Sequence, residues 1–156
     1  MPENMHIRQG KLHDADTIAD FNVALALETE DTRLNPATVA QGVRAMLENP
    51  QYGFYVVAER NGIILGGLMI TYEWSDWRNG VLWWIQSVFV RPEYRRQGVL
   101  KKLFAFLRQK AKQQGNVRGF RLYVEKNNQN AQTGYVRVGM KKAAYDVYQD
   151  LFPDAQ

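Results

Sequence analysis

The stretch VLWWIQSVFVRPEYRRQGVLKKLFAFLRQKAKQQG, residues 81–115, decides the fold of this chain. Its first ten residues are apolar on both faces of an extended backbone, which is typical of a central strand, and Pro92 ends them. From Gly98 to Gln114 apolar side chains recur at helical spacing with Lys and Arg opposite them, and Gly115 follows the last turn. The segment predicts a buried strand, a short basic turn and an amphipathic helix.

The residues before this segment predict two helices and an antiparallel hairpin. Apolar residues recur at helical spacing from Asp14 to Leu27 and again from Pro36 to Leu47, where proline suits the first helical turn. Asn61-Gly62 separates two β-rich runs, 54–58 and 63–70, and this dipeptide favours a tight hairpin turn. A further turn then leads into the central strand.

The residues after Gly115 predict a strand at 120–124, a helix at 130–138 and a last strand from Met140 to Tyr148. The expected order is βααβββαβαβ. A right-handed crossover through the basic helix makes the fourth and fifth strands parallel, beside an antiparallel meander. We therefore expect an α/β fold with a mixed sheet. A length of 156 residues suits one domain, residues 1–156, with its core at about 6–148.

The composition excludes several kinds of chemistry. The chain has no cysteine, so a cysteine nucleophile is excluded, and its only histidines are His6 and His13. No metal is expected. The longest apolar run, 81–85, is far too short to span a bilayer, and the first ten residues are polar. We expect a cytoplasmic protein with no membrane partner.

The charge distribution indicates a compact anionic ligand. The formal net charge is +4, and many basic residues cluster at the turn and along the helix after it: Arg91, Arg95, Arg96, Lys101, Lys102 and 108–112. The unpaired N–H groups and positive dipole end of a helix start suit a pyrophosphate. Gly98 would let the backbone approach it, and Arg95, Arg96 and Lys101 would add charge-assisted contacts. A helix start with solvated arginines is the alternative interpretation.

Two motifs follow one another at a fixed distance. The first is Arg95-x-x-Gly98-x-Leu100, and the second is Leu122-x-Val124-x-x-x-Asn128-x-x-Ala131-x-x-x-Tyr135-x-x-x-Gly139-Met140. Together they resemble the GNAT superfamily of acyl-CoA-dependent N-acyltransferases, whose pyrophosphate turn is Arg/Gln-x-x-Gly-x-Gly/Ala. Leu100 replaces the small residue of that turn, and Met140 stands where the family usually has Phe. The chain is also similar to a group of bacterial members with unassigned substrate, which share its E-T-E and Y-E-W-S-D-W segments.

The resemblance implies a co-substrate and a set of site residues. It implies that acetyl-CoA is the acyl donor, that its pantetheine arm lies along Val88, Phe89 and Val90, and that a backbone N–H there polarises the thioester carbonyl. It implies that Tyr135 is the general acid that protonates the CoA sulfur, with core packing as the alternative. Asn128 caps its helix or bonds the cofactor arm. The diphosphate would lie against Arg95, Arg96, Gln97, Gly98, Val99, Leu100 and Lys101.

The general base and the acceptor stay open. An amine with a pKa near ~10.4 is mostly protonated at neutral pH, so a carboxylate or a water chain must remove a proton. We favour Glu73, near the end of the third strand, then Glu28, with Glu30 and Asp76 as further candidates; a solvated surface acid is the alternative for each. Aromatic residues near these acids suit a cationic amine, such as a polyamine, an aminoglycoside or a Lys side chain: Tyr72, Trp74, Trp77, Trp83 and Trp84.

The sequence therefore predicts an N-acetyltransferase that moves an acetyl group from acetyl-CoA to a primary amine on a small molecule or peptide. Direct attack in a ternary complex follows if no other nucleophile intervenes, because no cysteine is present to carry the acyl group. The alternative is a catalytically degenerate module that senses acyl-CoA. A nucleic-acid binder is a third hypothesis, but no RNA-platform or helix-turn-helix motif supports a nucleic-acid partner. Edge strands in this fold often pair, so a homodimer is expected.

Overall fold

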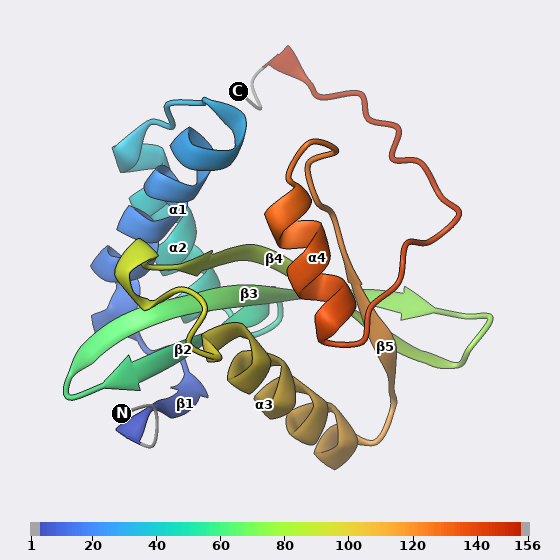
Figure 1. Cartoon of the computed structure of the whole chain (residues 1–156). Coiled ribbons are helices and arrows are strands. Elements are labelled where there is room, and N and C mark those ends of the chain that lie inside the picture. The colour runs from blue at the N-terminus through green and yellow to red at the C-terminus, as the bar shows by residue number, and fades with distance from the viewer. Residues whose placement is uncertain (1–3, 154–156) are drawn as a thin grey trace.

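The computed structural model describes residues 4–153 and contains one mixed sheet with helices on both faces (Figure 1). The elements are, in chain order, β1 His6–Gln9, α1 Ala15–Glu30, α2 Pro36–Glu48, β2 Gly53–Arg60, β3 Ile63–Ser75, β4 Gly80–Val90, α3 Val99–Gln114, β5 Val117–Leu122 and α4 Gln129–Arg137. Short 3₁₀ turns lie at Leu12–Asp14 and Pro92–Tyr94. Within the described residues, no helix has both the length and the apolar character of a membrane span.

The sheet has the strand order β1-β2-β3-β4-β5. The first four strands are antiparallel neighbours, and β5 runs parallel to β4 because α3 connects the two. This arrangement confirms the predicted antiparallel meander beside a parallel pair. The β2–β3 turn is the predicted Asn61-Gly62 hairpin, and both residues have positive φ, 52° and 79°.

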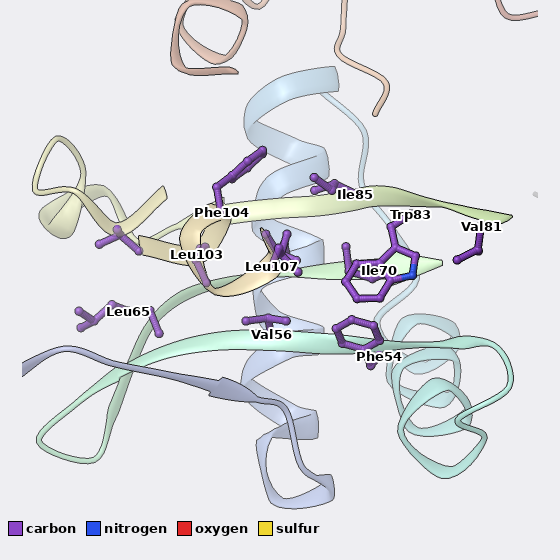
Figure 2. Close-up of a cluster of buried hydrophobic side chains, with 13 residues drawn as sticks. Phe54, Val56, Leu65, Ile70, Val81, Trp83, Ile85, Leu103, Phe104 and Leu107 are labelled. Carbon is purple, nitrogen blue, oxygen red and sulfur yellow. The ribbon is translucent and has the colours of Figure 1, made fainter. Parts of the chain in front are cut away.

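Alternation along β2 separates the hydrophobic core into two layers. Val56 packs in the layer that α3 covers, while its neighbour Val57 packs against α1 and α2, because successive strand side chains point to opposite faces. Figure 2 shows the first layer, in which Leu103, Phe104 and Leu107 of α3 lie over the strands. All three are fully buried, so the apolar stripe predicted for this helix anchors it to the sheet.

A buried ion pair holds the start of α1 against β1. Arg8 donates to both carboxylate oxygens of Asp14, at 2.8 and 2.9 Å, and also to Glu59 of β2 at 2.8 Å. Asp14 is 3% exposed. Burial alone would raise the pKa of the Asp14 carboxyl, but the hydrogen bonds from Arg8 and from the Lys11 backbone hold it below its ordinary value.

A bulge interrupts β4. Gly67 pairs with Phe89 and Met69 pairs with Gln86, so β4 has one more residue than β3 between these two pairs. Ser87 lies in the bulge with φ at 54°, an uncommon backbone conformation for serine. The bulge falls in the part of β4 that was predicted to contact the acyl donor.

The predicted last strand, Met140–Tyr148, does not form. These residues follow α4 as an extended segment without strand pairing, and Figure 1 shows that segment running past β5 and away from the sheet. Their apolar pattern predicted an extended backbone, but a strand also needs a partner, and β5 pairs only with β4 among the described residues. β5 itself begins three residues earlier than predicted and ends at Leu122.

Candidate active site

A cleft opens where β4 and β5 stop pairing. The last parallel pair is Ile85 with Leu122, after which β4 continues to Val90 without β5 beside it. The cleft has a volume of about 820 Å³ and is lined by the end of α1, β4 from Ile85 to Val90, the start of α3, the segment after β5, and α4. Pockets of this size hold small-molecule ligands and cofactors.

The start of α3 presents unpaired backbone N–H groups to this cleft. Gly98 is the residue before the helix, with φ at 82°, and no side chain caps the helix start. The first helical hydrogen bond runs from the Lys102 N–H to the Gly98 carbonyl, so the preceding N–H groups have no partner within the helix. Gly98, Val99, Leu100 and Lys101 all line the cleft. This geometry suits an anion.

Arg95 lies in the cleft wall but is turned towards α1. Its Nε donates to the Val90 carbonyl at 2.8 Å, and its two terminal nitrogens donate to the two carboxylate oxygens of Glu28, each at 2.8 Å. Arg96 and Lys101 also line the cleft, and neither forms an ion pair with another described residue. Gln97 is not part of the lining; its side chain donates to the Glu93 carbonyl at 3.2 Å.

The unusual Leu100 is accommodated by a glycine of α4. Leu100 packs against the core layer under α3, and its Cδ2 lies 3.4 Å from the position that a Cβ on Gly134 would occupy. Leu100 therefore occupies space between α3 and α4 while also contributing to the cleft lining.

Tyr135 and Asn128 reach the same cleft from α4 and its first turn. The Tyr135 ring packs near Phe104, with centroids 6.3 Å apart, and its hydroxyl forms no hydrogen bond with the described residues. Burial raises the pKa of Tyr135 to about 12, so its hydroxyl stays protonated at neutral pH. Asn128 accepts a hydrogen bond from the Ala131 N–H at 3.1 Å and thus caps α4.

The acidic candidates separate into two groups. Glu28 and Glu30 line the cleft, whereas Glu73 and Asp76 are not part of its lining. The Glu73 carboxylate accepts from Trp84 Nε1 at 2.6 Å and from Arg121 at 3.1 Å, so it is paired elsewhere on the sheet.

The aromatic residues expected to receive a cationic acceptor lie outside the cleft lining as well. Trp83 is fully buried in the core, and Tyr72, Trp74, Trp77 and Trp84 are not among the cleft residues. Trp83 therefore fills the core and Trp84 contacts Glu73 on the neighbouring strand, and neither forms part of the cleft surface.

Sequence reasoning missed several cleft residues. Val88, Phe89 and Val90 line the cleft as the resemblance implied, but Ser87 does so too, and its bulge carries no sequence signal because serine is not typical of positive φ. Tyr123 and Glu125 also contribute to the lining. Their position between the Leu122 and Asn128 landmarks of the second motif could have indicated them.

The described residues contain no group of three or more His, Cys, Asp or Glu side chains that could hold a metal ion. The cleft instead brings together a helix start with unpaired N–H groups, a protonated phenol and carboxylates. The chain belongs to the acetyltransferase (GNAT) family, whose model matches residues 19–140.

Solved structures agree with this assignment. A protein from Clostridium difficile 630 described as a "possible acetyltransferase" is 41% identical, with a TM-score of 0.88 over 95% of this chain and 97% of its own. A "predicted acetyltransferase" from Clostridium acetobutylicum, solved with acetyl-CoA, is 16% identical, with a TM-score of 0.76 over 94% of this chain and 96% of its own.

Another neighbour was solved with a bound aminoglycoside. An aminoglycoside acetyltransferase from an uncultured soil metagenomic sample, solved with sisomicin, is 17% identical, with a TM-score of 0.77 over 96% of this chain and 98% of its own. A search among curated proteins found no match. Family membership defines acetyl transfer as the class of activity, and the low identity of the last two structures shows the shared fold alone.

Proposed function

We propose that this chain, acting as one domain over residues 1–156, transfers an acetyl group from acetyl-CoA to a primary amine by direct attack in a ternary complex. The observation that carries the proposal is the cleft between β4 and β5, which joins the start of α3 to Tyr135 and to the carboxylates at the end of α1. Each of these parts meets one demand of the reaction.

The start of α3 would bind the diphosphate of coenzyme A. The N–H groups from Gly98 to Lys101 have no partner within the helix and would donate to an anion at the helix start, where the helix dipole favours negative charge. Arg96 and Lys101 add positive charge at the same wall. Arg95 would join them after exchanging Glu28 for a phosphate oxygen.

The bulge in β4 would polarise the thioester. A residue in a bulge has no ladder partner, so a backbone N–H near Ser87 and Val88 would be available to a carbonyl oxygen in the cleft. Such a donor stabilises the oxyanion that forms when the amine attacks the carbonyl carbon. The pantetheine arm would then lie along Val88 to Val90, with Asn128 near it.

Tyr135 would supply the proton for the leaving group. As the bond between the carbonyl carbon and sulfur breaks, the electron pair goes to sulfur, and the phenolic proton neutralises the thiolate. A pKa of about 12 means that Tyr135 carries this proton across the physiological range. The attacking nitrogen must lose a proton in turn.

Glu28 is the better candidate for that base. It lines the cleft, whereas Glu73 lies outside the lining. Both carboxylates are paired with an arginine, and Glu28 would be released when Arg95 turns to the diphosphate. Glu30 and Glu125 also line the cleft, and their negative charge would favour a cationic amine. This class includes aminoglycosides, polyamines and peptide amines.

The test is a calorimetric titration of the chain with acetyl-CoA, followed by a thiol-release assay over a panel of amines. We expect binding below millimolar concentration and turnover with cationic primary amines. Absence of binding at millimolar coenzyme A overturns the proposal. Binding without turnover of any amine favours a sensor of acyl-CoA, and turnover confined to neutral or anionic acceptors overturns the assigned acceptor class.

A further inference from the structure

One flank of α4 faces the first turn of α3. Asn130, Gly134 and Arg137 follow one another at spacings of four and three residues, so they share one side of the helix. A Cβ on Gly134 would lie 3.4 Å from Leu100 Cδ2, which places this flank against the start of α3. All three residues line the cleft. The flank therefore forms a second wall beside the helix start.

The last turn of α4 is held in place by α3. The Tyr135 ring packs near Phe104, with centroids 6.3 Å apart. The Arg108 guanidinium donates to the carbonyl of Val138, the residue that ends α4. Contacts at successive turns of α3 thus fix the part of α4 that carries Arg137.

Arg137 brings an unpaired positive charge into the cleft wall. Its side chain is exposed, and within residues 4–153 it forms no ion pair, side-chain hydrogen bond or ring contact. Arg95, in contrast, is paired with Glu28. A cation in the last turn of a helix is favoured by the helix dipole, but the dipole does not require it to face a cleft. The position of Arg137 suits an anionic group of the ligand.

This anionic group differs from the diphosphate. Under the proposed function the diphosphate lies at the start of α3, with Arg96 and Lys101 beside it, whereas Arg137 belongs to the wall formed by α4. Coenzyme A carries a further phosphate on its ribose, at the 3′ position, on the side of the diphosphate away from the pantetheine arm. Such a phosphate monoester has a charge of about −1.5 to −2 at pH 7 and accepts paired hydrogen bonds from a guanidinium.

We propose that Arg137 binds the ribose 3′-phosphate of coenzyme A and makes the protein selective for coenzyme A over 3′-dephospho-coenzyme A. The pantetheine arm occupies the side of β4, so the adenosine half of the ligand leaves the helix start along the flank of α4. Arg137 is the cation on that flank. The inference rests on the proposed function, because it needs coenzyme A in the cleft, and it concerns affinity for the donor rather than the transfer step.

The test compares two ligands that differ only in the 3′-phosphate. Calorimetric titrations give the Kd of the parent chain for coenzyme A and for 3′-dephospho-coenzyme A. We expect coenzyme A to bind at least about tenfold more tightly, as for one charge-assisted contact. Arg137→Gln should reduce this preference to less than about twofold by weakening coenzyme A alone. Arg137→Lys keeps the charge without the planar fork and should keep part of the preference.

Two further variants separate a specific contact from general attraction between charges. Lys102→Gln removes an exposed cation next to Lys101 but outside the cleft lining, and should leave both Kd values unchanged. Lys101→Gln should weaken both ligands by the same factor, because both contain the diphosphate. Thermal unfolding of Arg137→Gln should match that of the parent, since the exposed side chain has no partner to lose among the described residues.

The outcomes distinguish this inference from the proposed function. Equal Kd values of the parent for the two ligands overturn the inference alone, as does a preference that Arg137→Gln leaves intact. An equal loss of affinity for both ligands in Arg137→Gln also overturns it, because the contact would then not be with the 3′-phosphate. Failure of the parent to bind either ligand at millimolar concentration overturns the proposed function and the inference together.

Discussion

Arg95 and Glu28 are joined by two parallel hydrogen bonds of 2.8 Å, which connect the turn before α3 to the last turns of α1. The pair lies in the cleft wall, with side chains 38% and 44% exposed. In the proposed function the same guanidinium would bind the diphosphate at the start of α3. Glu28 and the anionic ligand would then compete for Arg95.

Glu28→Gln is expected to tighten binding of coenzyme A and to slow turnover. An exposed pair is worth ~0.2–1 kcal/mol, so its removal should lower the Kd by up to about fivefold. Loss of the proposed base should lower kcat at least ~10-fold. Calorimetry and steady-state kinetics measure the two effects. Glu93→Gln is the control, because Glu93 lies in the turn just before Arg95 but outside the cleft lining, and it should change neither the Kd nor kcat. Weaker binding in Glu28→Gln would contradict the competition.

Tyr135→Phe is expected to lower kcat by ~10- to 1000-fold, because the phenolic proton is lost while the ring remains. The Kd for acetyl-CoA should stay within about twofold, since the hydroxyl has no hydrogen-bond partner to lose among the described residues. Tyr123→Phe removes a second hydroxyl from the cleft lining and serves as the matched control. A parallel loss of affinity in Tyr135→Phe would indicate a packing role.

The pH profile of kcat/KM should rise with pH and stay high to at least about pH 10. The acceptor amine loses its proton as pH rises, which increases the reactive fraction. Tyr135, with its pKa raised to about 12, keeps its proton across this range and so does not lower kcat/KM. A descending limb between pH 7 and 9 that Tyr135→Phe abolishes would refute this assignment.

Gly98→Ala tests whether the start of α3 binds the diphosphate, and Gly62→Ala is the control. Gly98 and Gly62 have nearly equal φ, 82° and 79°, and an added Cβ meets nothing within 4 Å at either position. Alanine should therefore cost a similar ~1–2 kcal/mol of folding stability at both sites through backbone strain. Only Gly98→Ala should weaken coenzyme A binding, by at least about fivefold. Equal affinities in the two variants would exclude the start of α3 as the diphosphate site.

The sequence predicted most of the fold because its strongest signals are local. The Asn61-Gly62 turn, the apolar stripe of α3 and the Pro at the start of α2 each determine their element without distant contacts. The segment from Met140 failed as a strand because pairing depends on a partner, which alternation along one chain does not specify.

The sequence indicated those cleft residues that belong to a local backbone motif. The turn at Gly98 and the spacing to Tyr135 both led to cleft residues. Glu73 did not, because its contacts with Trp84 and Arg121 arise from cross-strand neighbours that sequence spacing cannot indicate. The Ser87 bulge was likewise invisible, since it comes from a register change between two strands.

Asp14→Asn is expected to lower the free energy of unfolding by ~3 kcal/mol, because it leaves the mostly buried Arg8 without the carboxylate that accepts two of its hydrogen bonds. The Asp14 pKa is below its ordinary value of 3.8 in the folded chain. Its contribution is therefore present above the unfolded pKa and is lost as pH falls through the folded one.

Urea denaturation across pH measures both parts of this expectation. The difference in the free energy of unfolding between the parent and Asp14→Asn should be constant near neutral pH. It should shrink below about pH 4, where the Asp14 carboxyl takes up a proton. Asp16→Asn is the matched control, because its side chain is 89% exposed and lies 3.7 Å from Arg44. That substitution should change stability by less than ~0.5 kcal/mol at any pH. Equal losses in the two variants would mean that the contact between Arg8 and Asp14 does not hold α1 to the sheet.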